Sequence, residues 1–440
     1  MKRDIAMREK IQKLKAFINA NISGGILWIF GSGVVSQISG FISSVVVIRK
    51  LPKADYGMYV DAYNIYCYIN VFIGLGLVNA VLQFCSENTT DARRGAIYRF
   101  ARSRGGIFNL VLLALIIAAG SIYKPDDAGF YLRIMCAYPI VIFTNKYYRN
   151  VLRVKRENKE YGIVCITYAV VVFFGNIIFT YCWGIVGLVL SSYLAYIATI
   201  IVARLMLRRE GFSASVRDAE YTLSRAEKKE LLSYSVLSAM TDFVAIVLVL
   251  LDITCLNLVL GDPAVLADYK VAMAIPTAML FVADSLSLYY YPSIVEAYST
   301  DRADFAMKTR RCIKVFLVIS AACAFLMFIF ADLIIYVIYG EKYMNMVPVY
   351  RVLTLNFLVN SGVRKFLGNV IAAIKKVKIN LLFASVAGVM NIVLDILFIR
   401  LFGVIGAAIA TLIVTVFIGA LETLYVLPYI RGGGEKKQSI

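Results

Sequence analysis

The chain has 440 residues, of which 60% are hydrophobic and only 17% are charged. Soluble domains carry about 25% charged residues, so this composition excludes an ordinary soluble fold and indicates a helical membrane protein. The formal net charge of +18 does not indicate a nucleic-acid partner, because the Lys and Arg residues lie in alternate connections between apolar runs. The sequence contains no His, which removes the commonest general base and the commonest metal ligand. We therefore predict no catalytic site, no metal site and no cofactor.

Twelve apolar runs are long enough to cross a bilayer, which takes about 20 residues of helix. A basic segment, residues 1–25, precedes the first run, and we interpret it as an amphipathic segment at the cytoplasmic membrane interface. The sequence thus predicts an all-α integral membrane fold of twelve transmembrane helices. In chain order, the predicted spans are 26–48, 58–82, 106–122, 131–148, 161–181, 184–206, 233–256, 264–289, 312–336, 347–368, 379–400 and 404–427.

The distribution of Lys and Arg predicts the topology. With the N-terminus in the cytoplasm, 37 of the 46 Lys and Arg residues fall in cytoplasmic tails and connections. Cytoplasmic loops carry such an excess of positive charge, so both termini are predicted to be cytoplasmic. The longest cytoplasmic connection, residues 207–232, then joins an N-terminal six-helix half, residues 1–206, to a C-terminal six-helix half, residues 233–427, which a flexible tail follows at residues 428–440.

Short motifs recur in the same order in the two halves. Asn150-Val151-Leu152 matches Asn369-Val370-Ile371, and Gly184-Ile185-Val186-Gly187 matches Gly403-Val404-Ile405-Gly406, both at an offset of 219 residues. Because six spans is an even number, the halves have parallel topology. We predict that a pseudo-two-fold axis along the membrane normal relates them, as in some transporters. Chance similarity among apolar, Gly-rich segments is the alternative.

The sequence resembles the Wzx-type polysaccharide flippases of the MOP exporter superfamily, which also contains the MATE drug exporters and the lipid II flippases. The resemblance runs over nearly the whole chain. Twelve spans fit the oligosaccharide branch better than the lipid II branch, which usually has fourteen. The marks of the resemblance are Ile48-Arg49-Lys50-Leu51 with Ala54-Asp55-Tyr56-Gly57, then Asn391-Ile392-Val393-Leu394-Asp395, and then the stretch from Phe402 to Thr411.

The resemblance implies a flippase that moves polyprenyl-diphosphate-linked oligosaccharide across the bacterial inner membrane by alternating access, for O-antigen, capsule or exopolysaccharide biosynthesis. The lipid tail can stay in the bilayer. The sugars and the diphosphate cannot cross hydrocarbon, because each unsatisfied polar group costs several kcal/mol. No covalent step is required, so we do not expect an enzyme. The expected partners are the lipid-linked oligosaccharide, the bilayer, H⁺ or Na⁺ as coupling ion, and polysaccharide-assembly machinery.

A cavity for a diphosphate should carry cations, which bind phosphate oxygens by charge-assisted hydrogen bonds. The candidates are Arg49 at the end of the first predicted span, Lys270 near the start of the eighth and Arg364 late in the tenth. For each, the alternative is a snorkelling or topology-determining charge. Lys270 is the strongest candidate, because Lys270, Thr277 and Asp284 lie seven residues apart on one helix face.

Two acids inside predicted spans, Asp242 and Asp284, are candidates for ion coupling. An intramembrane carboxyl is a functional candidate by default, and desolvation favours its protonated form, which would couple transport to protons. The alternative is an ion pair inside the bundle, for example between Asp284 and a Lys or Arg. The acids nearer the predicted interfaces are expected to be solvated; they are Asp61, Asp252, Asp332, Asp395 and Glu422.

The second predicted span carries a polar stripe. Asp61, Asn64 and Tyr68 follow i, i+3, i+7 spacing and face one way. Polar and aromatic groups on one stripe suit sugar hydroxyls and sugar rings, which makes the three residues candidates for substrate binding. Interhelical hydrogen bonding is the alternative.

Two other function classes stay open. An ion-coupled MATE-type exporter of small molecules would share the architecture, and drug sensitivity rather than surface polysaccharide would change on its deletion. A membrane enzyme, such as a polymerase or an acyltransferase, is disfavoured by the lack of His and by the short predicted outer loops.

Overall fold

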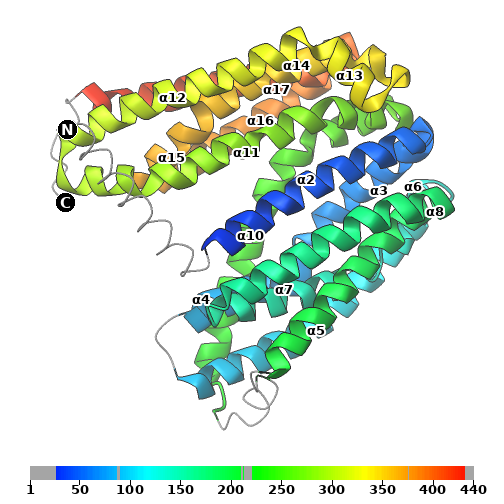
Figure 1. Ribbon diagram of the computed structural model, residues 1–440, viewed down its shortest axis with the longest axis vertical. Coiled ribbons are helices and arrows are strands. Elements are labelled where there is room, and N and C mark those ends of the chain that lie inside the picture. Colours follow the sequence, from blue (N-terminus) through cyan, green and yellow to red (C-terminus); the bar gives the residue numbers. More distant parts are fainter. Residues whose placement is uncertain (1–25, 87–89, 210–211, 213–220, 375, 432–440) are drawn as a thin grey trace, which may run out of the picture. The chain divides into compact units, whose positions relative to one another are not determined.

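The computed structural model describes residues 26–86, 90–209, 212, 221–374 and 376–431. Every regular element in these ranges is a helix (Figure 1), which confirms the predicted all-α class. The predicted interfacial segment, residues 1–25, lies outside the described residues, as do residues 213–220 of the predicted linker and residues 432–440 of the predicted tail.

The helices gather into two compact units. The first unit contains the described residues up to Leu51 together with Ala62–Val247, and the second contains Pro52–Asp61 and the described residues from Leu248 onward. Two helices, α3 (Lys53–Asn70) and α10 (Arg225–Leu260), therefore contribute residues to both units. The predicted division into halves around residues 207–232 stays a prediction.

The first unit is held together by small and hydroxyl side chains between long apolar helices. Ser43 of α2 is fully buried and accepts a hydrogen bond from Asn176 Nδ2 of α8 at 3.3 Å. Such contacts let membrane helices approach closely. Besides parts of α3 and α10, the unit contains α2 (Ile26–Lys50), η1 (Ile73–Gly76), α4 (Leu77–Ser86), α5 (Asp91–Ile122), α6 (Ala128–Ile134), α7 (Tyr138–Val154) and α8 (Asn158–Arg209).

The second unit has an aromatic core. Phe316 is fully buried, and its ring centroid lies 4.8 Å from that of Phe366. Besides parts of α3 and α10, the unit contains α11 (Pro263–Thr300), α12 (Arg302–Ile329), α13 (Ala331–Tyr339), η2 (Glu341–Met346), α14 (Val347–Val359), η3 (Asn360–Arg364), α15 (Lys365–Ala373), α16 (Val377–Phe402) and α17 (Val404–Arg431).

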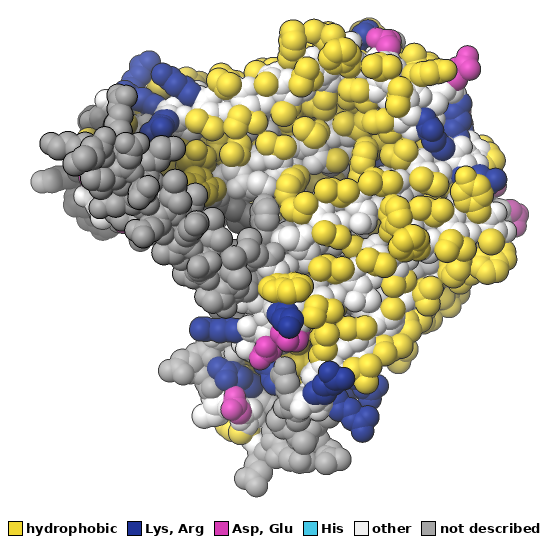
Figure 2. All heavy atoms as spheres, viewed as in Figure 1, with side chains coloured by type: hydrophobic (Ala, Val, Ile, Leu, Met, Phe, Trp, Pro, Cys, Tyr) yellow, Lys and Arg dark blue, Asp and Glu magenta, His cyan; other side chains and the backbone are white. Residues whose placement is uncertain are grey.

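Many of these helices are built to lie in lipid. Eight described helices are long and apolar enough to cross a membrane, and the number rises to ten if each of two bent helix pairs forms one span. Apolar side chains cover much of the visible helical surface (Figure 2), and Leu110 of α5 and Val318 of α12 are 57% and 66% exposed. Lipid rather than water must cover such side chains. The protein is therefore a multi-pass membrane protein, whereas the count of twelve spans stays a prediction.

Two tight helix junctions have the same local geometry, one in each unit. Gly184, inside α8, and Gly403, between α16 and α17, have positive φ angles of 56° and 64°, which L side chains adopt at a cost. Three residues later, a Cβ on Gly187 would lie 1.9 Å from the Phe179 carbonyl oxygen. A Cβ on Gly406 would lie 2.0 Å from the carbonyl oxygen of Phe398. The two glycine motifs that match in sequence thus also match in backbone conformation.

The second predicted span is broken where the sequence reads Gly74-Leu75-Gly76. Gly74 and Leu75 have left-handed φ angles of 57° and 54°, and the backbone N–H of Gly74 donates to Asn109 Oδ1 at 2.8 Å. A buried break needs such a partner, because it leaves backbone groups without helical hydrogen bonds.

Candidate functional site

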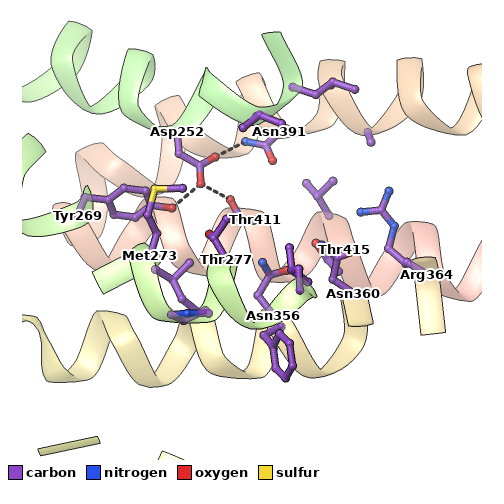
Figure 3. A pocket seen from close by; sticks show the side chains of 18 of the residues that line it. Asp252, Tyr269, Met273, Thr277, Asn356, Asn360, Arg364, Asn391, Thr411 and Thr415 are labelled. Atoms are coloured by element: carbon purple, nitrogen blue, oxygen red, sulfur yellow. Dashed lines mark hydrogen bonds between the residues drawn. The ribbon is translucent and has the colours of Figure 1, made fainter. Parts of the chain in front are cut away.

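The second unit contains a cavity of about 380 Å³. Helices α10, α11, α14, α16 and α17 and the π-helical turn η3 line it (Figure 3). Because a water molecule takes about 30 Å³ of liquid volume, the cavity has room for several waters or for an ion. Its polar lining residues are Asp252, Tyr269, Thr277, Asn356, Asn360, Arg364, Asn391, Thr411 and Thr415.

Asp252 of α10 anchors a hydrogen-bond cluster at one end of this cavity (Figure 3). Its Oδ2 atom accepts hydrogen bonds from the Tyr269 hydroxyl and from Thr411 Oγ1, the second at 2.8 Å. Its Oδ1 atom accepts one from Asn391 Nδ2 at 3.1 Å. Helices α11, α16 and α17 thus each contribute one donor to the same carboxyl. A carboxyl inside a membrane bundle is costly unless its oxygens are satisfied, and these contacts satisfy it.

Asp395 is joined to this cluster through Asn391 and is fully buried. Its Oδ2 atom accepts a hydrogen bond from Asn391 Nδ2 at 2.6 Å, so one amide nitrogen bridges Asp252 and Asp395. Its Oδ1 atom has no hydrogen-bond partner among the described residues. No Lys or Arg in the described part of the chain forms an ion pair with either carboxyl. Negative charge here therefore requires a bound cation or a proton to neutralise it.

The chemistry of these side chains suits a small hard cation. Asp252, Asp395, Asn391 and Thr411 offer carboxylate, amide and hydroxyl oxygens, which are preferred by hard cations and not by soft transition metals. The buried Asp395 Oδ1 atom without a partner is the feature that such a cation, or a proton on the carboxyl, would satisfy. The same oxygens therefore fit either Na⁺ or H⁺.

Arg364 lies at the end of the cavity away from Asp252 (Figure 3). It is the last residue of η3, a π-helical turn of five residues, and π turns inside α-helices are frequent at functional sites. Glu422 of α17 is buried and attracts the guanidinium. Arg364 nevertheless makes no hydrogen bond to a described residue, and its Nε atom is buried. Its guanidinium therefore has no acceptor among the described residues, and an anionic ligand in the cavity would supply one.

The predicted cavity cations fall in three different surroundings. Arg364 lines the cavity. Lys270 is half-buried and is not among the lining residues, although Thr277 on the same helix is. Arg49, in the last turn of α2, is exposed. A substrate-binding role for Arg49, Lys270 and Arg364 stays a prediction.

The two predicted coupling acids do not line this cavity. Asp284 forms an ion pair with Lys365 of α15, which is the alternative that the sequence left open. Asp242 is exposed and accepts a hydrogen bond from Asn79 Nδ2 at 3.1 Å. Coupling through Asp242 or Asp284 stays a prediction.

The predicted polar stripe of α3 lies largely inside the protein. Asp61 is buried and accepts a hydrogen bond from Asn257 Nδ2 of α10 at 2.7 Å, an interhelical contact of the kind that the sequence left as an alternative. Asn64 is buried as well. The ring of Tyr68 is half-buried, with its centroid 6.4 Å from that of Phe243. Sugar binding by these residues stays a prediction.

The expectation that acids near the predicted interfaces are solvated is wrong at three positions. Asp61, Asp395 and Glu422 are only 2%, 0% and 6% exposed, because neighbouring helices cover them. Asp252 is half-buried in the cavity wall. Asp332 is exposed, as expected, and pairs with Arg351. Distance from the end of a predicted span is therefore a poor guide to solvation in a bundle.

Residues 22–298, more than half of the sequence, match the family described as Polysaccharide biosynthesis protein. The chain belongs to this family. No curated protein matches the sequence.

Solved structures show which fold this polysaccharide biosynthesis family member has. An inward-facing multidrug resistance MATE family transporter of the MOP superfamily superposes with a TM-score of 0.73 at 14% identity, over 92% of this chain and 96% of that one. The lipid II flippase MurJ in an inward closed conformation gives 0.72 at 16% identity, over 91% and 87%. A MOP superfamily transporter from Pyrococcus furiosus gives 0.58 at 13% identity, over 94% of each chain. The family member therefore has the fold of MOP superfamily transporters and flippases.

Sequence reasoning missed the acid cluster, although part of its signal was visible. Asn391 and Asp395 are four residues apart and so share a helix face, and both lie in one of the motifs on which the resemblance rests. That spacing alone identifies a polar pair inside an apolar run. The meeting of this pair with Asp252 and Thr411 follows only from the packing of α10 and α17 against α16, which no local pattern encodes.

Proposed function

We propose that this protein is a flippase that moves oligosaccharide linked to a polyprenyl diphosphate across the bacterial inner membrane, for O-antigen, capsule or exopolysaccharide assembly. The proposal is supported by membership of the polysaccharide biosynthesis family, by a fold shared with MOP superfamily transporters and with a lipid II flippase, and by a cavity with a polar lining inside apolar helices. The polar lining of the cavity is the observation that carries the proposal, because polar groups inside a membrane bundle are costly and mark substrate or ion pathways.

Translocation of this kind needs no covalent chemistry. The polyprenyl chain remains in the lipid, and the protein supplies a polar path for the sugars and the diphosphate. No described side chain forms a hydrogen bond with the guanidinium of Arg364. Arg364 is therefore a binding residue for a phosphate oxygen on this path. Alternating access exposes the path to one side of the membrane and then to the other.

Eight described helices, or ten with the two bent pairs, are each long and apolar enough for one span. Twelve spans are compatible with this number. Helix α8 has 52 residues, which is roughly 78 Å if straight, about twice the thickness of a bilayer. Its non-helical residues Trp183 and Gly184 lie where the sequence predicts the connection between two spans. Helices α14 and α15 join through η3 into one run, at the tenth predicted span. With twelve spans, the Lys and Arg distribution predicts that both termini are cytoplasmic.

We further propose that a cation drives the transport cycle from the Asp252 and Asp395 cluster. The cluster has oxygen donors, a buried unpartnered carboxylate oxygen and no compensating Lys or Arg among the described residues. Na⁺ or H⁺ bound there stabilises the transporter conformation in which the cluster residues stay together. Release of the ion stabilises the alternative conformation. A ligand shifts such an equilibrium only by its difference in affinity for the two states.

The test is reconstitution of the purified full chain in proteoliposomes with a fluorescent polyprenyl-diphosphate-linked oligosaccharide. We expect the labelled head group to become accessible to a membrane-impermeant reagent only when the protein is present. A deletion strain should lose surface polysaccharide and accumulate inward-facing lipid-linked units. If the strain instead keeps its polysaccharide and becomes drug-sensitive, the protein is a MATE-type exporter. Elongation of glycan chains by the purified protein would make it an enzyme. Association with polysaccharide-assembly machinery remains part of the proposal.

A further inference from the structure

The first unit contains a run of tyrosine rings that neither the cavity nor the acid cluster uses. Ring centroids are 5.9 Å apart for Tyr63 and Tyr66, 5.3 Å for Tyr66 and Tyr138, 6.5 Å for Tyr138 and Tyr196, and 5.0 Å for Tyr196 and Tyr168. We call these five residues the tyrosine ladder. They come from α3, α7 and α8, so three helices converge on one aromatic surface.

The middle of the ladder is packed, as in an ordinary core. Tyr66 and Tyr138 are buried. The Tyr66 hydroxyl donates to Asn70 Oδ1 at 2.7 Å, and the Tyr138 hydroxyl donates to the Val189 carbonyl at 3.1 Å. These two rings therefore form a rigid support whose polar atoms are already bonded.

The outer members of the ladder have a different character. Tyr63 is 39% exposed, and Tyr168 and Tyr196 are half-buried. The Tyr168 hydroxyl donates to the Tyr196 hydroxyl at 3.3 Å. These partly exposed residues therefore offer apolar ring surface together with polar hydroxyl groups.

A guanidinium group lies beside this surface. Arg149 of α7 contacts Tyr161, which lies seven residues before Tyr168 and so on the same face of α8. Its Nη2 atom donates to the Tyr161 hydroxyl at 2.8 Å, and the guanidinium carbon lies 5.0 Å from the centroid of that ring. Its other guanidinium nitrogens make no hydrogen bond within the described chain. Tyr161 therefore holds Arg149 in place, and the remaining N–H groups have no acceptor among the described residues.

We propose that Tyr63, Tyr168, Tyr196 and Arg149 form a binding site for a glycosyl phosphate, the part of a lipid-linked oligosaccharide where the first sugar joins the phosphate. Tyrosine suits a sugar because its ring packs on the apolar ring face while its hydroxyl bonds the sugar hydroxyls. Arginine suits the phosphate because its planar donors match two oxygens at once. This inference rests on the proposed flippase function and names the residues of the first unit that hold the head group.

Saturation-transfer difference NMR on the full chain in nanodiscs tests the site. The probes are glucose 1-phosphate and N-acetylglucosamine 1-phosphate, compared with methyl α-glucoside and inorganic phosphate. We expect the sugar phosphates to bind more tightly than either half alone, with saturation reaching the protons of the sugar ring. Arg149→Gln should weaken sugar-phosphate binding by about tenfold or more, to the level of the neutral glucoside. Tyr196→Ala should weaken sugar phosphate and glucoside alike.

Control variants separate binding from folding. Tyr181→Ala, on α8 but outside the ladder and 60% exposed, should bind the probes like the wild type. Tyr168→Phe and Tyr196→Phe keep the packed rings and remove only hydroxyls, so a loss of affinity at an unchanged Tm shows that the hydroxyls bind the sugar. The inference is overturned if the wild type binds no probe, if phosphate alone binds as tightly as the sugar phosphates, or if no ladder or Arg149 variant changes affinity. Flipping by the wild type, measured separately, then shows whether the proposed function stands without the site.

Discussion

Asp395→Asn is the most direct test of the acid cluster in the second unit. Asn has nearly the shape of Asp and keeps one oxygen, so the substitution removes the negative charge with little change in packing. Asp395 is fully buried and shares the Asn391 amide with Asp252. The variant therefore leaves the cluster with one carboxyl where the wild type has two.

The expected magnitude follows from the charge that is lost. Two unit charges 4 Å apart interact by about 4 kcal/mol at an effective dielectric constant of 20. Part of this is retained, because Asn still offers an oxygen and because less charge has to be desolvated. We therefore expect a loss of roughly 1.4 to 2.8 kcal/mol in Na⁺ binding, a factor of about 10 to 100 in Kd.

Thermal unfolding of the purified protein in NaCl and in N-methylglucamine chloride of equal ionic strength measures this loss. At 100 times its Kd a ligand stabilises the folded state by about 2.7 kcal/mol, and a tenfold weaker site gives about 1.4 kcal/mol at the same concentration. The Na⁺-dependent rise in Tm should thus fall by about half or more in Asp395→Asn. Without Na⁺ the free energy of unfolding of the variant should exceed that of the wild type. The wild type then keeps a buried negative charge that no cation neutralises, and the variant does not.

Asp332→Asn is the matched control, since Asp332 is an exposed acid of the same unit that pairs with Arg351. It should keep the wild-type response to Na⁺. If H⁺ is the natural occupant, acidification rather than Na⁺ should raise the Tm of the wild type, and Asp395→Asn should blunt that rise. Equal responses of wild type and Asp395→Asn to both ions would refute the assignment of the cluster as a cation site.

Three further outcomes follow from single residues. Gly403→Ala places a side chain at a φ of 64° and should lower stability by about 1–2 kcal/mol. Gly368→Ala is the control and should be neutral or stabilising, because an added Cβ there meets open space. The Tm measures both effects. Arg364→Gln should fold normally yet lose flipping in proteoliposomes, and retained flipping would exclude Arg364 as a phosphate ligand. Asp284→Asn removes the partly exposed Asp284–Lys365 ion pair and should change the free energy of unfolding by no more than about 1 kcal/mol. It should leave the ion dependence of transport intact. Loss of that dependence would identify Asp284 as a coupling residue.

The fold was largely predictable because a bilayer restricts what an apolar run can do. Long uncharged runs have to form helices in lipid, since no other local structure bonds every backbone group. The breaks within those runs were not predictable in the same way. The π turn at Asn360–Arg364 and the left-handed residues at Gly74 and Leu75 depend on partners such as Asn109. Hydropathy records how apolar a segment is, and a hydrogen bond from a distant helix leaves no trace in it.

The site was harder to predict because burial in a bundle depends on neighbours. Arg364 was found from its charge inside an apolar run, and it does line the cavity. Asp395 was placed in water because it lies near the end of its predicted span, yet α16 packs so that it is fully buried. Asp252 and Thr411 are separated by 159 residues, and only their tertiary contact shows that they act on the same site.

The motifs that recur at an offset of 219 residues bear on why the proposed cation site lies in the second unit. The glycine junctions match at an offset of 219 residues in sequence and in backbone conformation. At the same offset, Asp395 of the second unit corresponds to Asn176 of the first. Asn176 accepts a hydrogen bond from Ser191 and donates one to Ser43, so the first unit has a neutral, satisfied cluster where the second has an ionisable carboxyl with an unpartnered oxygen. A neutral cluster has no charge for a cation to neutralise, so the proposed ion coupling belongs to the second unit, where the sequence supplies the acids.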